Sequence, residues 1–365
     1  MEPKKSVLVG LSGGIDSAVA AFLLKEKGFR VEGIFFKFFN EDHSSIIQGT
    51  DTSNVGAFEE SRVGMLAKIL DIPLNRVNYQ KKFSAIVIHD FISQYQKGFT
   101  PNPCILCNEK VKFHLLFNYA NKHNLEFIAT GHYARIGKSR NQKKFLLKRG
   151  IDQKKDQSYF LYRLNQDILS KSIFPLGKLL KRDVEKIALK IGLDLQGINE
   201  SQEVCFLRGE NYRKFIENKL GREYKSKMGY FLDTSGNILG KHRGIAFYTV
   251  GQRKKIGLSL NTRKYIVRIN HNDHTIIVGD EADLYQREFK IENIHMISMQ
   301  PLKKPVRLKV QIRYNTPAAY AKVFPCKENK MHIFFDEPQR AIAPGQSAVF
   351  YQREYVIGGG MISGL

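Results

Sequence analysis

The chain has 365 residues, of which 42% are hydrophobic and 25% are charged. This composition is typical of globular proteins and excludes wholesale disorder, while the length exceeds what one hydrophobic core usually organises and predicts two or three domains. The 58 Lys and Arg against 35 Asp and Glu give a formal charge of +23, which attracts polyanions. Nucleic acid is the leading class of partner, although a Lys-rich solvated surface explains the charge equally well.

The first 130 residues alternate between strand and helix patterns. Short apolar runs predict strands at Ser6–Leu11, Val31–Phe36, Leu74–Tyr79 and Leu125–Thr130, and apolar residues at helical spacing predict helices at Ser17–Lys27, Glu59–Leu70 and Phe113–His123. Strands alternating with helices predict a doubly wound, parallel α/β sheet. The polar segment Glu41–Gly56 has no periodicity, and we expect it to be a loop near the strand ends, where loops commonly cover ligands.

After Leu207 the pattern changes to short strands separated by turn residues. Tyr230–Leu239 has the pattern of a hairpin around Thr234-Ser235-Gly236, and we expect Tyr351–Leu365 to close a barrel or a sheet edge. These shifts predict three domains: a catalytic α/β domain at residues 1–207, a small central domain at 208–282 and a β-barrel-like domain at 283–365. The last two rest more on the resemblance described below than on the pattern.

No segment predicts membrane insertion or secretion. No run approaches the roughly 20 apolar residues that a membrane helix needs, and Lys4 and Lys5 lead into a strand pattern without a signal-peptide cleavage site. The four cysteines are too few for a disulfide-stapled secreted fold. We expect a cytoplasmic protein with no membrane partner.

The segment between the first strand and the first helix has the composition of a phosphate-binding loop. It reads Gly10-Leu11-Ser12-Gly13-Gly14-Ile15-Asp16-Ser17 and lies where backbone N–H groups and the helix dipole bind anions. It matches neither the GxxxxGK[ST] nor the GxGxxG pattern. Its glycines allow close approach, Ser12 and Ser17 can donate hydroxyls to phosphate, and Asp16 could hold Mg²⁺ through water or cap the helix. An ordinary capped turn is the alternative, but SGGxDS at this junction favours phosphate.

The cysteines leave three interpretations open. Cys104 and Cys107 form a CxxC after two prolines and just before a predicted helix, so a thiol there ionises more easily. They could form a zinc site, a thioredoxin-like redox pair of Cys104 with Cys107, or a catalytic relay that includes Cys205. Zinc would need Cys205 or His114 as a further ligand, because no second CxxC or Hx3–5H stands at finger spacing. We expect Cys326, in the β-rich tail, to pack.

Several motifs together resemble a known family. SGGxDS resembles the PP-loop ATP pyrophosphatases, whose motif cradles the pyrophosphate of ATP. The motifs TPNPCILCN (100–108), ATGHYAR (129–135), KDQSYFL (155–161), ESQEVCFL (200–207) and YTVGQRKKIGL (248–258) resemble bacterial tRNA-specific 2-thiouridylases along essentially the whole chain. The resemblance implies an adenine nucleotide alpha hydrolase-like N-terminal fold and a tRNA-uridine 2-sulfurtransferase that uses ATP and Mg²⁺ and has no tightly bound prosthetic group.

The resemblance also implies a reaction. ATP would adenylate the C2 oxygen of the wobble uridine, position 34 of tRNA, and Cys205 would receive persulfide sulfur from a cysteine desulfurase or a relay protein. Cys107 would be the first catalytic cysteine and would form a disulfide with Cys205 as sulfur is delivered. The products would be 2-thiouridine, AMP and pyrophosphate. Many members carry Asp where this chain has Cys104, and a thiol is a poorer acid–base group.

The remaining site residues follow from the same resemblance. It implies that adenine is bordered by Phe36 and Gly131, that the target base is contacted by Asn102, Pro103 and Cys104, and that tRNA is contacted by His132, Lys155, Asp156, Gln157, Arg313, Tyr314 and Gln346. Thiolation at C2 requires an unstacked base, which an anticodon loop supplies most easily. Taken singly, each tRNA-facing residue has an ordinary structural explanation. Another PP-loop enzyme and a non-catalytic, zinc-stabilised RNA-binding module are the competing functions.

Overall fold

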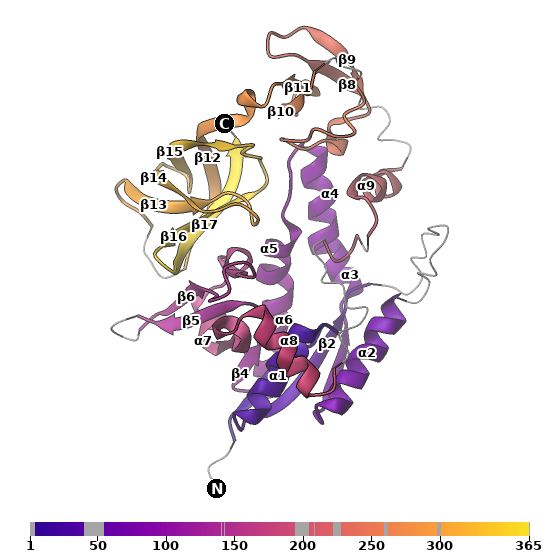
Figure 1. Cartoon of the computed structure of the whole chain (residues 1–365), viewed down its shortest axis with the longest axis vertical. Helices are drawn as coiled ribbons and strands as arrows, with labels where there is room; N and C mark the ends of the chain where they lie inside the picture. Colours follow the sequence, from indigo (N-terminus) through magenta and orange to yellow (C-terminus); the bar gives the residue numbers. More distant parts are fainter. Residues whose placement is uncertain are drawn as a thin grey trace. The chain divides into compact units, whose positions relative to one another are not determined.

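The computed structural model describes residues 4–39, 55–139, 141, 143–193, 204–207, 209–221, 228–258, 262–297 and 301–364. The chain divides into two compact units (Figure 1). The first unit comprises Met1–Ile86, Ile105–Ser201 and Glu354–Val356, and the second comprises Val87–Cys104, Gln202–Arg353 and Ile357–Leu365. Most of the predicted loop at 41–56 lies outside the described residues.

The elements up to residue 190, apart from α4, belong wholly or mainly to the first unit. They are β1 (Ser6–Gly10), α1 (Ile15–Glu26), β2 (Arg30–Lys37), α2 (Val55–Ile69), β3 (Leu74–Asn78), α3 (Gln80–Phe83), η1 (Ser84–Ile88), α5 (Pro103–Cys107), η2 (Asn108–Lys112), α6 (Phe113–Lys122), β4 (Phe127–Ala129), β5 (Ala134–Lys138), β6 (Phe145–Arg149), η3 (Ser158–Leu161), α7 (Gln166–Lys171), β7 (Ser172–Ile173), η4 (Pro175–Lys178) and α8 (Lys181–Lys190).

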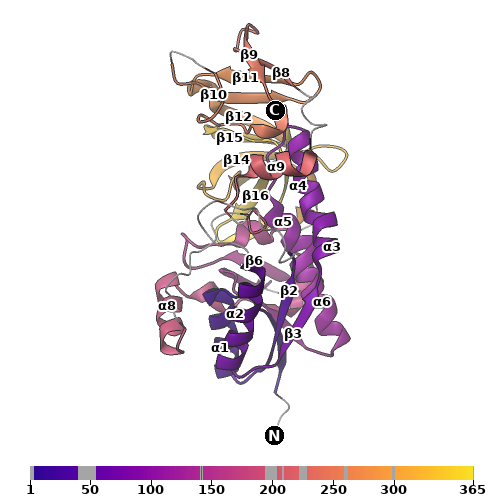
Figure 2. The ribbon, with the colours of Figure 1, turned by 90° about the vertical axis from the view of Figure 1, so that its right-hand side faces the viewer.

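A five-stranded parallel sheet organises the first unit. Its strand order is β3-β2-β1-β4-β7, and every neighbouring pair is parallel. One apolar cluster joins the sheet to α1, α2 and α8, and Figure 2 shows α6 on the opposite face. Val7, Leu8 and Val9 are fully buried because helices cover both faces of β1. The predicted doubly wound α/β fold and its first four strands are therefore confirmed.

The helical region before β4 is longer than we predicted. It runs through α5, η2 and α6 from Pro103 to Lys122, so the CxxC lies inside the first turns of a helix. Our placement of the CxxC before the helix was wrong. Pro103 has the fixed φ and the missing N–H that suit the first position of a helix, and Ile105 and Val111 supply buried apolar positions.

The second unit is mostly β over its described residues, which also include the α-helices α4 and α9 and short 3-10 helices. Its elements are α4 (His89–Gln96), α9 (Tyr212–Leu220), β8 (Gly229–Leu232), β9 (Ile238–His242), η6 (Ile245–Phe247), β10 (Tyr265–Asn270), β11 (Thr275–Gly279), η7 (Ala282–Leu284), β12 (Tyr285–Met296), β13 (Val306–Gln311), β14 (Ala319–Pro325), β15 (Met331–Arg340), β16 (Ser347–Gln352) and β17 (Tyr355–Gly364), whose first two residues belong to the first unit.

Two sheets form the second unit. Strands β10-β11-β8-β9 make a small sheet that contains the predicted β8–β9 hairpin. Strands β12-β15-β14-β13-β16-β17 form a barrel, which closes because β17 also pairs with β12. The expected closing role of the last strand and the barrel-like C-terminal fold are thus confirmed. The domain boundaries at 207 and 282 stay predictions.

The structure also bears on two further expectations, the packing of Cys326 and the search for membrane-spanning helices. Cys326 is exposed in the turn between β14 and β15, so its expected packing role was wrong; a turn at a barrel rim has no core to enter. Among the helices of the described ranges, none is long and apolar enough to cross a membrane.

Candidate functional site

The loop between β1 and α1 is a tight turn held by hydrogen bonds of its own serines. Gly13 has φ +80°, a left-handed conformation that favours glycine. The buried Ser17 Oγ donates to the Gly14 carbonyl at 2.9 Å and accepts from Ser12 N at 3.2 Å, whereas Ser12 is exposed. Gly14 is the N-cap and supplies no side chain, so Asp16 is not the capping residue. The start of α1 therefore presents backbone N–H groups at a surface that suits an anion.

Asp16 contacts Tyr133 and Lys181, two residues that were not predicted as site residues from the sequence. Its Oδ1 accepts a hydrogen bond from Tyr133 Oη at 2.9 Å and lies 2.8 Å from Lys181 Nζ. Tyr133 is buried. Its backbone N–H donates to Gln157 Oε1, and its carbonyl accepts from the backbone N–H of Gln157. Tyr133 lies within the ATGHYAR motif, but Lys181 stands in an ordinary helical pattern and carries no sequence signal.

Gly131 packs directly against the start of α1. A Cβ atom at Gly131 would lie 2.6 Å from the Asp16 carbonyl carbon and 2.8 Å from Ser17 N, so only glycine fits. The loop after β4 therefore adjoins the 10–17 loop, as parallel neighbours whose carboxyl ends share one edge require. Phe36, predicted with Gly131 beside the nucleotide base, is half-buried near the end of β2 and stacks on Phe38 with ring centroids 6.0 Å apart.

His132 is a neutral, hydrogen-bonded histidine. Its Nδ1 lies 2.8 Å from Thr130 Oγ1, and its ring packs against Phe113 with centroids 5.6 Å apart. Desolvation by burial, together with the charge of Lys112, lowers the pKa of His132 to about 3. The imidazole is partly accessible and can exchange a hydrogen bond with RNA, but near pH 7 it carries no charge for a phosphate.

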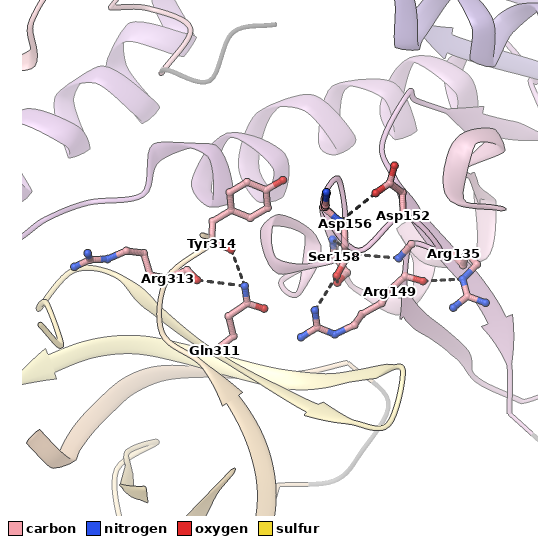
Figure 3. Close-up of polar contacts among 10 residues, drawn as sticks. Arg135, Arg149, Asp152, Asp156, Ser158, Gln311, Arg313 and Tyr314 are labelled. Atoms are coloured by element: carbon pink, nitrogen blue, oxygen red, sulfur yellow. Dashed lines mark hydrogen bonds and ion pairs between the residues drawn. The ribbon is translucent and has the colours of Figure 1, made fainter. Parts of the chain in front are cut away.

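Asp156 holds the shape of the loop that carries Lys155 and Gln157. The carboxylate is buried and accepts from Gly150 N at 2.9 Å, from Ser158 N at 3.1 Å and from Ser158 Oγ at 3.0 Å. Arg149 Nη1 completes the set at 3.1 Å (Figure 3). These contacts make Asp156 a positioning residue for the half-buried Lys155. RNA contact by residues 155–157 stays a prediction.

The CxxC presents one half-buried and one buried thiol. Cys104 is half-buried near the start of α5, and Cys107 at its end is 6% exposed. Asn108 follows, with its Nδ2 donating to the Phe160 carbonyl at 3.2 Å. Its Oδ1 is one of four buried side-chain atoms without a hydrogen-bond partner among the residues that the structure describes.

The segment that leads to Asn102, Pro103 and Cys104 is held by the loop before β16. Gln346 is buried, and its Nε2 donates to the Thr100 carbonyl at 2.7 Å and to the Pro101 carbonyl at 3.4 Å. Thr100 N in turn donates to the Pro344 carbonyl at 2.7 Å. The amide of Gln346 is thus engaged with the two residues that precede the segment predicted to meet the target base.

Cys205 is exposed on a turn that is held in place by its neighbour Phe206. The cysteine is exposed, while its neighbour Phe206 is buried. The Phe206 ring packs edge-on against Phe91 and is tilted against Phe215, with centroids 5.0 and 5.4 Å away. An exposed thiol on a fixed turn suits exchange with another protein.

Arg313 and Tyr314 lie half-buried just after β13. Their carbonyls accept from Gln311 Nε2 at 3.2 and 2.8 Å (Figure 3), and Arg313 Nη2 donates to the Ala341 carbonyl at 3.0 Å. Across the described ranges, no three His, Cys, Asp or Glu residues gather as a metal site would require.

Comparison with known proteins identifies the family. Three family models match: a tRNA methyl transferase HUP domain over residues 5–209, a tRNA methyl transferase PRC-barrel domain over 213–280 and an aminomethyltransferase β-barrel domain over 286–362. A tRNA-specific 2-thiouridylase MnmA from Acetivibrio thermocellus is 42% identical over 98% of this chain and 99% of that protein, and one from Caldicellulosiruptor saccharolyticus is 42% identical over 98% of each. The chain belongs to the tRNA-specific 2-thiouridylase family.

This membership confirms the resemblance drawn from the motifs. The domain models carry the words methyl transferase, but the full-length relatives are named as 2-thiouridylases, which are sulfurtransferases. A solved NMN synthetase from Francisella tularensis is 19% identical, covers 60% of this chain and 78% of that chain, and has a TM-score of 0.33, which is too distant to support an argument.

Gly131→Ala is expected to disrupt the start of α1. The added Cβ would contact the backbone of Asp16 and Ser17 at 2.6 to 2.8 Å, and overpacking of this kind costs about 1–3 kcal/mol. Urea unfolding should show the loss, and nucleotide binding should weaken with it. Gly10→Ala, whose Cβ would meet neighbours at 3.5 Å or more, is the matched control for stability. Equal stability of the two variants would contradict the packing argument.

Gln346→Leu is expected to loosen residues 100–104. The substitution removes the donor to the Thr100 carbonyl, and a buried acceptor left unsatisfied costs about 1–3 kcal/mol. Hydrogen exchange should rise in this segment. Gln352→Leu, at an exposed position of β16, is the control. If exchange at 100–104 is the same in both variants, Gln346 does not hold the segment.

His132 is expected to destabilise the fold in mild acid. Its pKa of about 3 lies below the ordinary value of 6.5, so between these values the unfolded chain binds more protons, and the folded state loses stability as the pH is lowered. The loss from pH 7.5 to 5.5 should be on the order of 1 kcal/mol. Urea unfolding at both pH values should show a smaller pH dependence for His132→Gln; an unchanged dependence would contradict the burial of a neutral imidazole.

Proposed function

We propose that this chain converts uridine 34 of tRNA to 2-thiouridine, with ATP as activator and a protein persulfide as sulfur source. The observation that carries the proposal is the full-length match to tRNA-specific 2-thiouridylases, at 42% identity over 98% of the chain. The +23 charge favours a polyanionic substrate, and reduced thiols and tRNA are expected together in the cytoplasm.

The 10–17 loop is proposed to bind ATP. The backbone N–H groups at the start of α1 and the exposed Ser12 hydroxyl can donate to phosphate oxygens. Phe36 and Gly131 would border the adenine. The uridine C2 oxygen attacks the α-phosphorus, a P–O bond breaks, and pyrophosphate leaves. Mg²⁺ bound with ATP would offset charge on the phosphates, and Asp16 can face its water shell through Oδ2, because its known partners occupy Oδ1.

The two thiols are proposed to deliver sulfur. Cys205, exposed beside an anchored Phe206, receives a sulfane sulfur from a cysteine desulfurase or a relay protein. Sulfur from this persulfide attacks C2 directly or as hydrosulfide, and AMP leaves with the C2 oxygen. Cys107 attacks the Cys205 sulfur and forms a disulfide, so two thiols are oxidised while the sulfane sulfur is reduced. A dithiol reductant then resets the pair.

The RNA contacts are proposed from several segments of the chain. Asn102, Pro103 and Cys104 would meet the extruded base, while Lys155, Asp156 and Gln157 would position the tRNA. His132 would supply a neutral hydrogen bond, and Arg313 with Tyr314 would offer a cation beside a ring. The contribution proposed for Gln346 is indirect, because it holds the base-contacting segment in place.

Nucleoside mass spectrometry tests the reaction. Wild-type protein with ATP, Mg²⁺, a persulfide donor and unmodified tRNA should form 2-thiouridine, whereas Cys107→Ser and Cys205→Ser should form at least about 100-fold less because each removes a reacting thiol. Cys326→Ser, at an exposed turn, is the matched control and should retain activity. Cys104→Ser tests the extra thiol of the CxxC.

The pattern of products separates the alternatives. No thiolation by wild type despite ATP binding would indicate another PP-loop activity. Thiolation without ATP would contradict adenylation. Full activity of either thiol variant would contradict the relay.

A further inference from the structure

The 10–17 loop has a net negative side-chain charge, although it is proposed to bind a polyanion. Residues 10–17 contain no Lys or Arg, and Asp16 adds a negative charge to the first turn of α1. A triphosphate beside this carboxylate would be stabilised by a cationic side chain in addition to the helix dipole and any Mg²⁺ that accompanies ATP, because like charges at short range repel. A cation from elsewhere in the fold is therefore expected at the loop.

Lys181 brings a cation to this loop. Its Nζ lies 2.8 Å from Asp16 Oδ1, and its side chain is only 13% exposed. The Asp16 side chain remains 34% exposed, so the pair lies at the edge of the loop rather than in the core. Lys181 is the first residue of α8, which packs on α1 within the shared apolar cluster. The ammonium is thus carried by a helix fixed to the phosphate loop's own helix.

A second aspartate fixes the start of α8. The N-cap residue Leu180 supplies no side-chain hydrogen bond, and instead Asp152 Oδ2 accepts from Lys181 N at 2.9 Å. Asp152 Oδ1 also accepts from Lys154 N at 3.1 Å, which ties the capping carboxylate to its own turn. Figure 3 shows Asp152 beside the loop organised by Asp156. The backbone of Lys181 is therefore positioned by Asp152 while its ammonium is held at Asp16.

We propose that Lys181 is a phosphate-binding residue of the nucleotide site, held at the loop by Asp16 before ATP binds and positioned by Asp152. An ammonium has three N–H donors, so Lys181 can keep Asp16 as a partner while donating to a phosphate oxygen. The proposal rests on ATP use as proposed above and adds a residue to that site. The alternative is that Lys181 only neutralises Asp16.

Binding of Mg²⁺–ATP and of AMP to the full-length chain tests the role of Lys181. Lys181→Gln should raise the Kd for ATP about 10- to 100-fold, the effect of losing one charge-assisted hydrogen bond. Affinity for AMP should fall much less, because AMP lacks the β- and γ-phosphates. Lys181→Arg should retain most ATP affinity. Arg182→Gln removes a cation from an exposed side chain one residue away and is the matched control.

The double variant Asp16→Asn/Lys181→Gln separates phosphate binding from charge neutralisation. It leaves no unpaired charge, so it should fold even if Lys181→Gln does not. If Lys181 only neutralises Asp16, the double variant binds ATP as tightly as Asp16→Asn alone; if Lys181 binds phosphate, the double variant binds ATP more weakly than Asp16→Asn. Normal ATP affinity of Lys181→Gln, or equal ATP affinity of the double variant and Asp16→Asn, would overturn the proposal. A wild-type chain that binds no ATP would instead overturn the proposed function.

Discussion

Close contact between the loop after β4 and the first turn of α1 constrains the 10–17 loop, which is proposed to bind ATP. Gly131 permits that contact because it has no Cβ, and Tyr133, two residues further on, reaches Asp16 with its hydroxyl. The backbone of the same tyrosine is hydrogen-bonded to both the side chain and the backbone N–H of Gln157. A change at this contact is therefore felt both at the phosphate loop and in the segment proposed to meet tRNA.

Buried polar residues of this chain mainly hold loops in place. The carboxylate oxygens of Asp156 accept hydrogen bonds from its own loop and from Arg149. The amide of Gln346 donates to the carbonyls that precede the proposed base-contacting segment. A family resemblance assigns both residues to tRNA contact. Their burial assigns them a second task, because a loop that must receive RNA gains affinity when it is ordered beforehand.

The proposed catalytic thiols occupy contrasting environments. Cys107 is buried in a helix beside an asparagine with an unpartnered acceptor, whereas Cys205 is exposed on a turn anchored by an aromatic side chain. This contrast suits a division of labour. A sulfur acceptor must be accessible to a donor protein, while a thiol that resolves the product reacts best away from competing solutes.

The sequence by itself determined the alternation of strands and helices, the Gly-rich turn at 10–17 between the first strand and the first helix, the mostly β C-terminal third and, through several motifs in order, the family. These features depend on local pattern, which adjacent residues carry. Only the tertiary structure decided that Pro103 starts a helix containing the CxxC, that Cys326 is exposed, and that Lys181 and Tyr133 meet at Asp16. Lys181 is 165 positions from Asp16 and gives no local signal. Such contacts arise from the packing of α8 on α1 and from the order of parallel strands, which no short window of sequence contains.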